Sequence, residues 1–182
     1  MGNCSGFICN FFRNRVYCLI GDKMKSVYIE TTIPSLITSW ASRDTVVAGR
    51  QAVTINFWEN ERHKYDLYVS QFVLNECSQG DTDAAMRRLE LIKEIQVLQD
   101  SDQVAELADA YQKLLNIPEK AKVDCFHLAV SVIYKMDYLL SWNCTHLGAR
   151  TLLEVEKYNA KRGLHTPILT TPEAFMEIEM EG

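Results

Sequence analysis

Short apolar segments alternate along the chain with longer segments of helical periodicity. The apolar segments are rich in Val, Ile, Leu and Tyr, a composition typical of β-strands. They lie at residues 27–29, 67–69, 96–98, 138–141 and 168–170. Between them, apolar residues at helical spacing predict helices at 34–41, 45–63, 71–79, from 81, at 102–115, 120–135, 146–162 and from 172. Strands that alternate with helices predict an α/β fold with a parallel sheet and right-handed crossovers.

The length and charge of the chain limit the classes of protein to which it can belong. Its 182 residues suffice for one domain with a substantial core. The net charge of −5 excludes a bulk basic field that would gather nucleic acid non-specifically. No apolar run is long enough to span a bilayer, so we expect no membrane partner. Six cysteines without a CxxC pair indicate free thiols and a reducing, cytoplasmic setting.

The first 23 residues, MGNCSGFICNFFRNRVYCLIGDK, have neither helical nor strand periodicity. Arg13 and Arg15 interrupt their apolar stretch, which argues against the core of a signal peptide. We therefore predict that residues 1–23 are a poorly ordered extension without a function of its own. Residues 24–182 then form a single domain.

Three acidic residues occupy positions where a buried face or a strand end is expected. Glu30 directly follows the strand at 27–29, Glu76 shares a helical face with Phe72 and Val73, and Asp124 lies in the first turn of a later helix. The strand at 138–141 is followed shortly by Asn143. Each has an ordinary explanation: a capping residue, a half-exposed helix residue, a helix-end charge or a turn residue.

Taken together, these four residues predict a cation site. In a parallel α/β fold, ligands bind at the carboxyl ends of the strands, where these side chains can converge. Three carboxylates at close range repel one another unless a cation joins them. Hard oxygen ligands of this kind suit Mg²⁺ or Mn²⁺. A phosphatase of the haloacid dehalogenase type is excluded, because "IETT" lacks the DxD motif after the first strand.

The order of these motifs resembles the PIN-domain nucleases, and among them the VapC-type toxins of bacterial toxin–antitoxin systems. That pattern has an acid after the first strand, a Glu in a helix after the second, an Asp that opens a later helix, and a strand ending in Thr/Ser-x-Asp. The segments VYIETTIPS, VSQFVLNEC, VDCFHLAV and DYLLSWN match it in order between about residues 25 and 175. The resemblance implies a three-layer α/β/α domain with a short, mostly parallel central sheet.

The resemblance also implies an activity and its partners. It implies a toxin of a type II pair that hydrolyses phosphodiester bonds in single-stranded RNA, with Mg²⁺ or Mn²⁺ held by Glu30, Glu76, Asp124 and Asn143 as the metal-binding and catalytic residues. It further implies a cognate antitoxin and a homodimer. Two positions depart from the pattern: Glu30 stands where Asp is usual, and Asn143 replaces the fourth acid. A one-metal site is therefore expected, and the alternative is a weak or inactive PIN-like module that binds RNA or protein.

Several neighbouring residues are further candidates. His127 and His146 could contact substrate, although structural hydrogen bonding is the commoner role of such histidines. The spacings Cys125-x-His127 and Cys144-x-His146 are not usual for zinc. Trp142 is a candidate for the core or for base stacking. The candidate phosphate contacts, which can equally be solvated helix charges, are Arg43, Arg50, Arg87 and Arg88.

Overall fold

A parallel sheet of five strands forms the centre of the molecule. A computed structural model describes residues 24–143 and 149–181. The strands are β1 (Ser26–Ile29), β2 (Asp66–Ser70), β3 (Gln96–Leu98), β4 (Tyr138–Leu140) and β5 (Ile168–Thr170), in the spatial order β3-β2-β1-β4-β5. Every pair is parallel, so the predicted α/β class is confirmed.

The first strand occupies the middle of the sheet. Tyr28 lies opposite Tyr68 of β2 on one side and Leu139 of β4 on the other. Val27, Tyr28 and Ile29 are all 0% exposed. A strand covered on both faces is expected to be apolar at every position, as residues 27–29 are.

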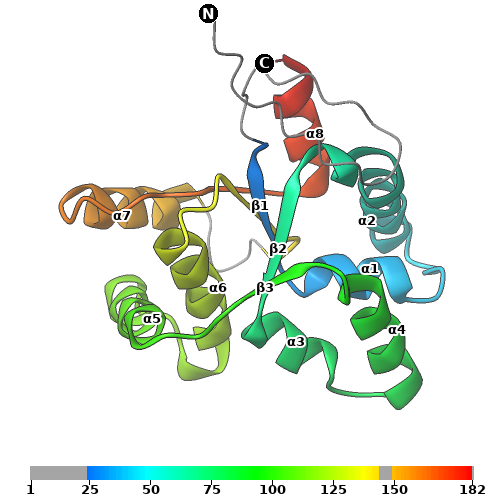
Figure 1. Cartoon of the computed structure of the whole chain (residues 1–182), viewed down its shortest axis with the longest axis horizontal. Helices are drawn as coiled ribbons and strands as arrows, with labels where there is room; N and C mark the ends of the chain where they lie inside the picture. Colours follow the sequence, from blue (N-terminus) through cyan, green and yellow to red (C-terminus); the bar gives the residue numbers. More distant parts are fainter. Residues whose placement is uncertain (1–23, 144–148, 182) are drawn as a thin grey trace, which may run out of the picture.

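Helices cover both faces of this sheet. They are α1 (Thr32–Thr38), α2 (Thr45–Asn56), α3 (Gln71–Cys77), α4 (Thr82–Ile92), α5 (Asp102–Leu115), α6 (Lys122–Ile133), α7 (Ala149–Ala160) and α8 (Pro172–Glu181). Figure 1 shows α5, α6 and α7 on one side of the strands, and α1, α2, α4 and α8 on the other. This is the predicted three-layer arrangement. No helix in the described part of the chain is long and apolar enough to cross a membrane.

Local capping explains where several helices begin and end. The Ser70 hydroxyl accepts a hydrogen bond from the Val73 amide, and Asp81 accepts one from the Ala84 amide. α5 ends at Leu115, and its C-cap residue Asn116 has a left-handed φ of 51°. The starts predicted at residues 71 and 81 therefore have a physical basis in their side chains.

The helix predicted over residues 45–63 is interrupted. α2 ends at Asn56 and continues as a π-helical segment (Phe57–Glu61) and a 3₁₀ turn (Arg62–Lys64). Phe57 and Trp58 are consecutive and both buried. A regular amphipathic helix with one buried stripe would not bury two adjacent aromatic side chains so completely.

The helix α6 is buried on most of its surface, because it lies between α5 and the sheet. Phe126 and Ile133 are among its half-buried residues. The helix predicted over 120–135 begins at Lys122 after a 3₁₀ turn (Glu119–Ala121). The helix predicted from 146 is α7; residues 144–148 and the predicted extension 1–23 lie outside the described residues.

Candidate metal centre at the carboxyl edge of the sheet

The carboxylate of Glu30 is buried and well supplied with hydrogen bonds. Glu30 is 7% exposed and directly follows the central strand β1. Its Oε2 accepts hydrogen bonds from the Thr32 amide (3.0 Å), the Thr32 hydroxyl (2.5 Å) and the Ser141 hydroxyl (2.8 Å). These donors offset the cost of taking a carboxylate out of water.

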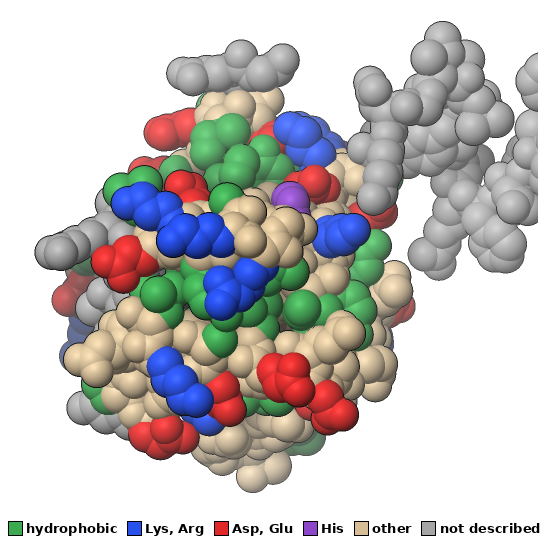
Figure 2. Space-filling view, turned by 90° about the vertical axis from the view of Figure 1, so that its left-hand side faces the viewer, with side chains coloured by type: hydrophobic (Ala, Val, Ile, Leu, Met, Phe, Trp, Pro, Cys, Tyr) green, Lys and Arg blue, Asp and Glu red, His purple; other side chains and the backbone are tan. Residues whose placement is uncertain are grey.

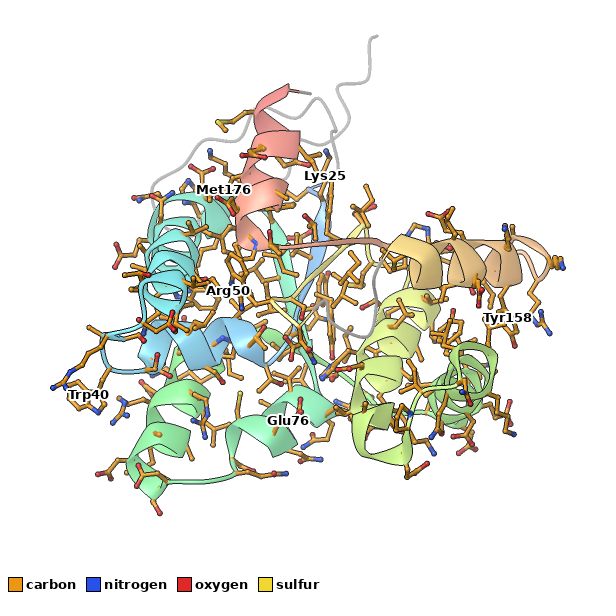
Figure 3. All side chains as sticks on the ribbon, turned by 180° about the vertical axis from the view of Figure 1, so that it is seen from behind. Lys25, Trp40, Arg50, Glu76, Tyr158 and Met176 are labelled. Carbon is orange, nitrogen blue, oxygen red and sulfur yellow. The ribbon has the colours of Figure 1, made fainter. Side chains whose placement is uncertain are left out.

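Glu76 approaches the same edge of the sheet from α3 (Figure 3). Its Oε2 accepts from the Thr31 hydroxyl at 2.5 Å and lies 2.9 Å from Nε2 of His127. Burial acts to raise the pKa of Glu76, but the hydrogen bond and charge of His127 and the hydrogen bond of Thr31 outweigh it. The pKa therefore lies below its usual value, and Glu76 is ionised at neutral pH.

His127 connects Glu76 to the core. The ring is 2% exposed, and its Nδ1 lies 2.8 Å from the Tyr28 hydroxyl. That hydroxyl is in turn 2.6 Å from the hydroxyl of Ser70. An ionised carboxylate can only accept, so Nε2 donates to Glu76. Burial raises the pKa of Tyr28, which keeps its hydroxyl protonated.

Asp124 and Asn143 form a second pair beside these groups. Asp124 is 6% exposed in the first turn of α6, and its Oδ1 accepts from Nδ2 of Asn143 at 2.8 Å. The backbone amide of Asn143 donates to the Ser141 hydroxyl at 2.8 Å. Since the same hydroxyl donates to Glu30, Ser141 links the two halves of the site.

The structure therefore brings the four predicted residues to one edge of the sheet, in two subgroups. The closest potential ligand atoms belong to Glu30, Glu76 and His127 and lie within 4.8 Å of one another. A small cavity is lined by Glu30, Asp124, His127, Ser141 and Asn143, with Leu139 and Leu169. Two carboxylates at this spacing, with a third beside them, fit one hard divalent cation.

The geometry distinguishes the oxygen donors from His127. Both ring nitrogens of His127 already have hydrogen-bond partners, Tyr28 and Glu76. A histidine so engaged orients a carboxylate and does not need to bind the ion itself. The side-chain amide nitrogen of Asn143 donates a hydrogen bond to the carboxylate of Asp124, so Asn143 satisfies one acceptor oxygen of that acid.

Sequence patterns did not single out the hydroxyl donors of the site. Thr31, Thr32 and Ser141 supply most of the hydrogen bonds to Glu30 and Glu76. The sequence did contain a signal for these donors: two threonines follow Glu30, and a serine ends the predicted strand before Asn143.

The remaining candidates have separate positions. Trp142 is half-buried at the rim of the site, and Arg43 is exposed. Arg88 donates to the backbone oxygens of Cys77 and Gln79 at the end of α3. Cys125 is buried, which raises the pKa of its thiol to about 11 and disfavours a zinc-binding thiolate. Cys144 and His146 lie outside the described residues.

No family model matches the chain, and no curated protein matches it in sequence. Its structure is similar to that of VapC20 from Mycobacterium tuberculosis, a toxin that cleaves the sarcin–ricin loop. The TM-score is 0.53 at 13% identity, over 66% of this chain and 92% of VapC20. The fold is therefore PIN-like and similar to that of VapC20. VapBC2 from Rickettsia felis, in complex with promoter DNA, aligns at a TM-score of 0.47 and 11% identity, over 80% of this chain and 98% of that one.

The PIN-domain fold explains why residues distant in the sequence converge. β1 and β4 are neighbours, so Glu30 and Ser141 follow adjacent strands at the same edge. The stacked rings of Phe72 and Phe126, whose centroids are 4.4 Å apart, hold α3 against α6. This contact brings Glu76 next to the first turns of α6.

Proposed function

We propose that this PIN-domain protein is a metal-dependent endoribonuclease that hydrolyses phosphodiester bonds in single-stranded RNA. The observation that carries the proposal is the gathering of Glu30, Glu76 and Asp124 at the carboxyl edge of the sheet. Uncompensated carboxylates so close together repel, and a divalent cation removes that repulsion. The likeness of the fold to VapC20, a toxin that cleaves the sarcin–ricin loop, supports RNA as the substrate class.

Each residue has a distinct role in this proposal. Glu30, Glu76 and Asp124 would hold Mg²⁺ or Mn²⁺, and Asn143 could add its carbonyl oxygen as a neutral ligand. When bound, the ion activates water and offsets the negative charge of the phosphate. His127 keeps Glu76 ionised and oriented, and Thr32 and Ser141 hold Glu30. One of the carboxylates of the site would accept a proton from the attacking water.

We further propose that the protein acts in the cytoplasm as the toxin of a type II toxin–antitoxin pair. A cognate antitoxin and a homodimer are the partners that this assignment implies. The similarity in fold to a known toxin supports it.

A second candidate function rests on the pair of Asp124 and Asn143. Their hydrogen bond satisfies Asp124 without an ion, where the PIN-domain pattern has a fourth acid. A protein with this exchange could bind RNA or a protein partner with weak or no cleavage.

RNA cleavage under controlled metal conditions tests the proposal. The full chain is incubated with labelled single-stranded RNA and Mg²⁺ or Mn²⁺. We expect cleavage that EDTA removes and that Glu76→Gln or Asp124→Asn lowers by at least about 100-fold, since each change removes charge that stabilises the reaction. The control is Glu156→Gln, an exposed acid on α7. Cleavage that persists in EDTA contradicts the mechanism; binding without cleavage in either metal supports the second candidate.

A further inference from the structure

Arg50 is an exposed cation beside the candidate metal centre. It lies on α2, and Figure 3 shows its side chain on the part of that helix that faces the strands. Its guanidinium carbon is 5.2 Å from the centre of the Trp142 ring. Among the residues that the structure describes, no acid forms an ion pair with Arg50.

The ring beneath Arg50 is anchored at both ends. The backbone amide of Trp142 donates to the Thr32 hydroxyl at 2.9 Å, and its indole Nε1–H donates to the Thr54 hydroxyl at 2.9 Å. Thr54 itself donates to the backbone oxygen of Arg50 at 2.6 Å. The indole and the backbone of Arg50 are therefore fixed to each other, and the guanidinium stacks on a rigid surface.

This arrangement connects directly to both halves of the metal centre. The Thr32 hydroxyl that accepts from Trp142 also donates to Glu30. The next residue, Asn143, donates to Asp124. Arg50 is thus connected to Glu30 through Trp142 and Thr32 and to Asp124 through Trp142 and Asn143, so one RNA strand can contact both Arg50 and the carboxylates.

The negative charge of the site makes a nearby cation such as Arg50 necessary for binding RNA. Three carboxylates gather in a protein of net charge −5, and an RNA strand is a polyanion. An ion at the centre can neutralise the phosphate that is cut, but the neighbouring phosphates need a separate cation. A guanidinium that stacks through its face keeps its N–H edge free to bind a phosphate in two places.

The other arginines near α1 and α4 are engaged in the fold. Arg88 donates to the carbonyl oxygens of Cys77 and Gln79, and Arg87 donates to that of Thr38. Among the described residues, the Arg50 guanidinium forms no hydrogen bond of this kind, and of these three arginines only Arg50 lies against Trp142 at the rim of the site. Figure 2 shows, on the face that carries α5 and α7, basic and acidic side chains intermixed without a continuous basic surface.

We propose that Arg50, stacked on the anchored indole of Trp142, binds a phosphate of the RNA strand adjacent to the phosphodiester that is cut. This inference rests on the proposed function and names the residue that positions its substrate. The RNA strand then runs from the carboxylates across the rim formed by Trp142 toward α2.

Binding of RNA without cleavage tests this assignment. The affinity of the full chain for a fluorescein-labelled single-stranded RNA is measured in EDTA over a series of salt concentrations. We expect Arg50→Gln to weaken binding about tenfold, the effect of losing one charge-assisted contact of about 1.4 kcal/mol. Its salt dependence should fall by about 0.7 in the slope of log K against log salt, the value for one phosphate on a single strand. Arg50→Lys should retain the slope and part of the affinity.

The matched control is Arg162→Gln. Arg162 is also exposed and stacks on an aromatic ring, with 3.6 Å between its guanidinium carbon and the centre of the Tyr158 ring. Tyr158 lies on α7, at the far side of the molecule from Arg50 (Figure 3). This variant should bind RNA like the wild type, because distant charges are screened.

Three outcomes are informative: two would contradict the assignment of Arg50, and one would contradict the proposed function. If the wild type cleaves RNA in a metal-dependent manner, and Arg50→Gln binds with unchanged affinity and salt slope, the assignment of Arg50 is wrong and the proposed function stands. An equal loss in Arg50→Gln and Arg162→Gln also overturns the assignment, because it shows a general charge effect. If the wild type neither binds nor cleaves RNA, the proposed function fails and Arg50 has no such role.

Discussion

At the scale of single residues, hydrogen bonding decides whether a carboxylate at a strand end can be tolerated. Glu30 is almost fully buried, yet three donors from Thr32 and Ser141 meet its Oε2. The sequence predicted that Glu30, Glu76 and Asp124 converge, because strand ends and helix faces follow from periodicity. It could not predict that His127 binds Glu76, since the two are 51 positions apart and belong to different helices.

Replacement of His127 tests its part in the site. His127→Phe removes one hydrogen-bond partner from Glu76, which keeps Thr31, and one from the buried Tyr28 hydroxyl, which keeps Ser70, so we expect a loss of about 1–3 kcal/mol in the free energy of unfolding. The stabilisation by Mg²⁺ should also shrink, because Glu76 is no longer oriented. Chemical denaturation with and without Mg²⁺ measures both. A control is Cys125→Ala on the same helix, which should lower stability without changing the response to Mg²⁺; an unaltered response in His127→Phe contradicts its orienting role.

At the scale of elements, the order of strands and helices follows from the sequence, and departures arise where tertiary packing overrides the local pattern. The strands at 96–98 and 168–170 and the helix α5 have the predicted bounds. The π-helical segment at Phe57–Glu61 was not predictable, because the burial of both Phe57 and Trp58 depends on contacts with distant elements. The all-round burial of α6 likewise depends on α5 and the sheet, which no helical stripe reveals.

The attachment of α8 to the sheet carries a prediction about pH. Glu179 on α8 accepts from Lys25 Nζ at 2.8 Å and from the Tyr138 hydroxyl at 2.6 Å. Burial acts to raise the pKa of Glu179, but these donors and the charge of Lys25 lower it overall. A lowered pKa contributes stability above the unfolded value of about 4.3, and this contribution is lost as the pH falls through the folded value.

The comparison of Glu179→Gln with the wild type measures this contribution. We expect the variant to be less stable at pH 7 by about 1 kcal/mol, and the difference to diminish below about pH 4. The control is Glu177→Gln, an exposed position on the same helix. A difference that is constant from pH 7 to pH 3 would show that the carboxylate charge is not what matters.

At the scale of the whole molecule, the described residues form a complete core. The sheet is covered on both faces, and every buried side-chain nitrogen or oxygen in the described part has a hydrogen-bond partner. The central position of β1 places Glu30 between β2, which is followed by α3 with Glu76, and β4, which is followed by Ser141 and Asn143. The spatial order of the strands cannot be read from hydrophobic periodicity, which identifies strands but not their neighbours.

This completeness supports the prediction that residues 1–23 are dispensable. A chain that begins at Met24 should melt within a few degrees of the full chain and retain its RNA cleavage, because the core and the site are built from later residues. Differential scanning calorimetry and the cleavage assay measure the two properties. A large fall in the melting temperature would show that the first 23 residues contribute to the folded core.

The central claim is that Glu30, Glu76, Asp124 and Asn143 form one cation site. Its most direct test is the melting temperature of the wild type, Asp124→Asn and Asn143→Asp, each with EDTA and with Mg²⁺. In EDTA, Asp124→Asn should be more stable than the wild type by about 1 kcal/mol, because one repelling charge is removed and the acceptor for Asn143 remains. Asn143→Asp should be less stable than the wild type, because it replaces that hydrogen bond with repulsion between two carboxylates.

The rise in melting temperature on addition of Mg²⁺ should follow the opposite order to the stability in EDTA. An ion that binds only the folded state stabilises that state by RT ln(1 + [L]/Kd), so tighter binding gives a larger rise in the melting temperature. The rise should be smallest for Asp124→Asn, intermediate for the wild type and largest for Asn143→Asp, which restores the fourth acid. An equal rise in all three proteins would contradict the account, because the four residues would then not share one ion.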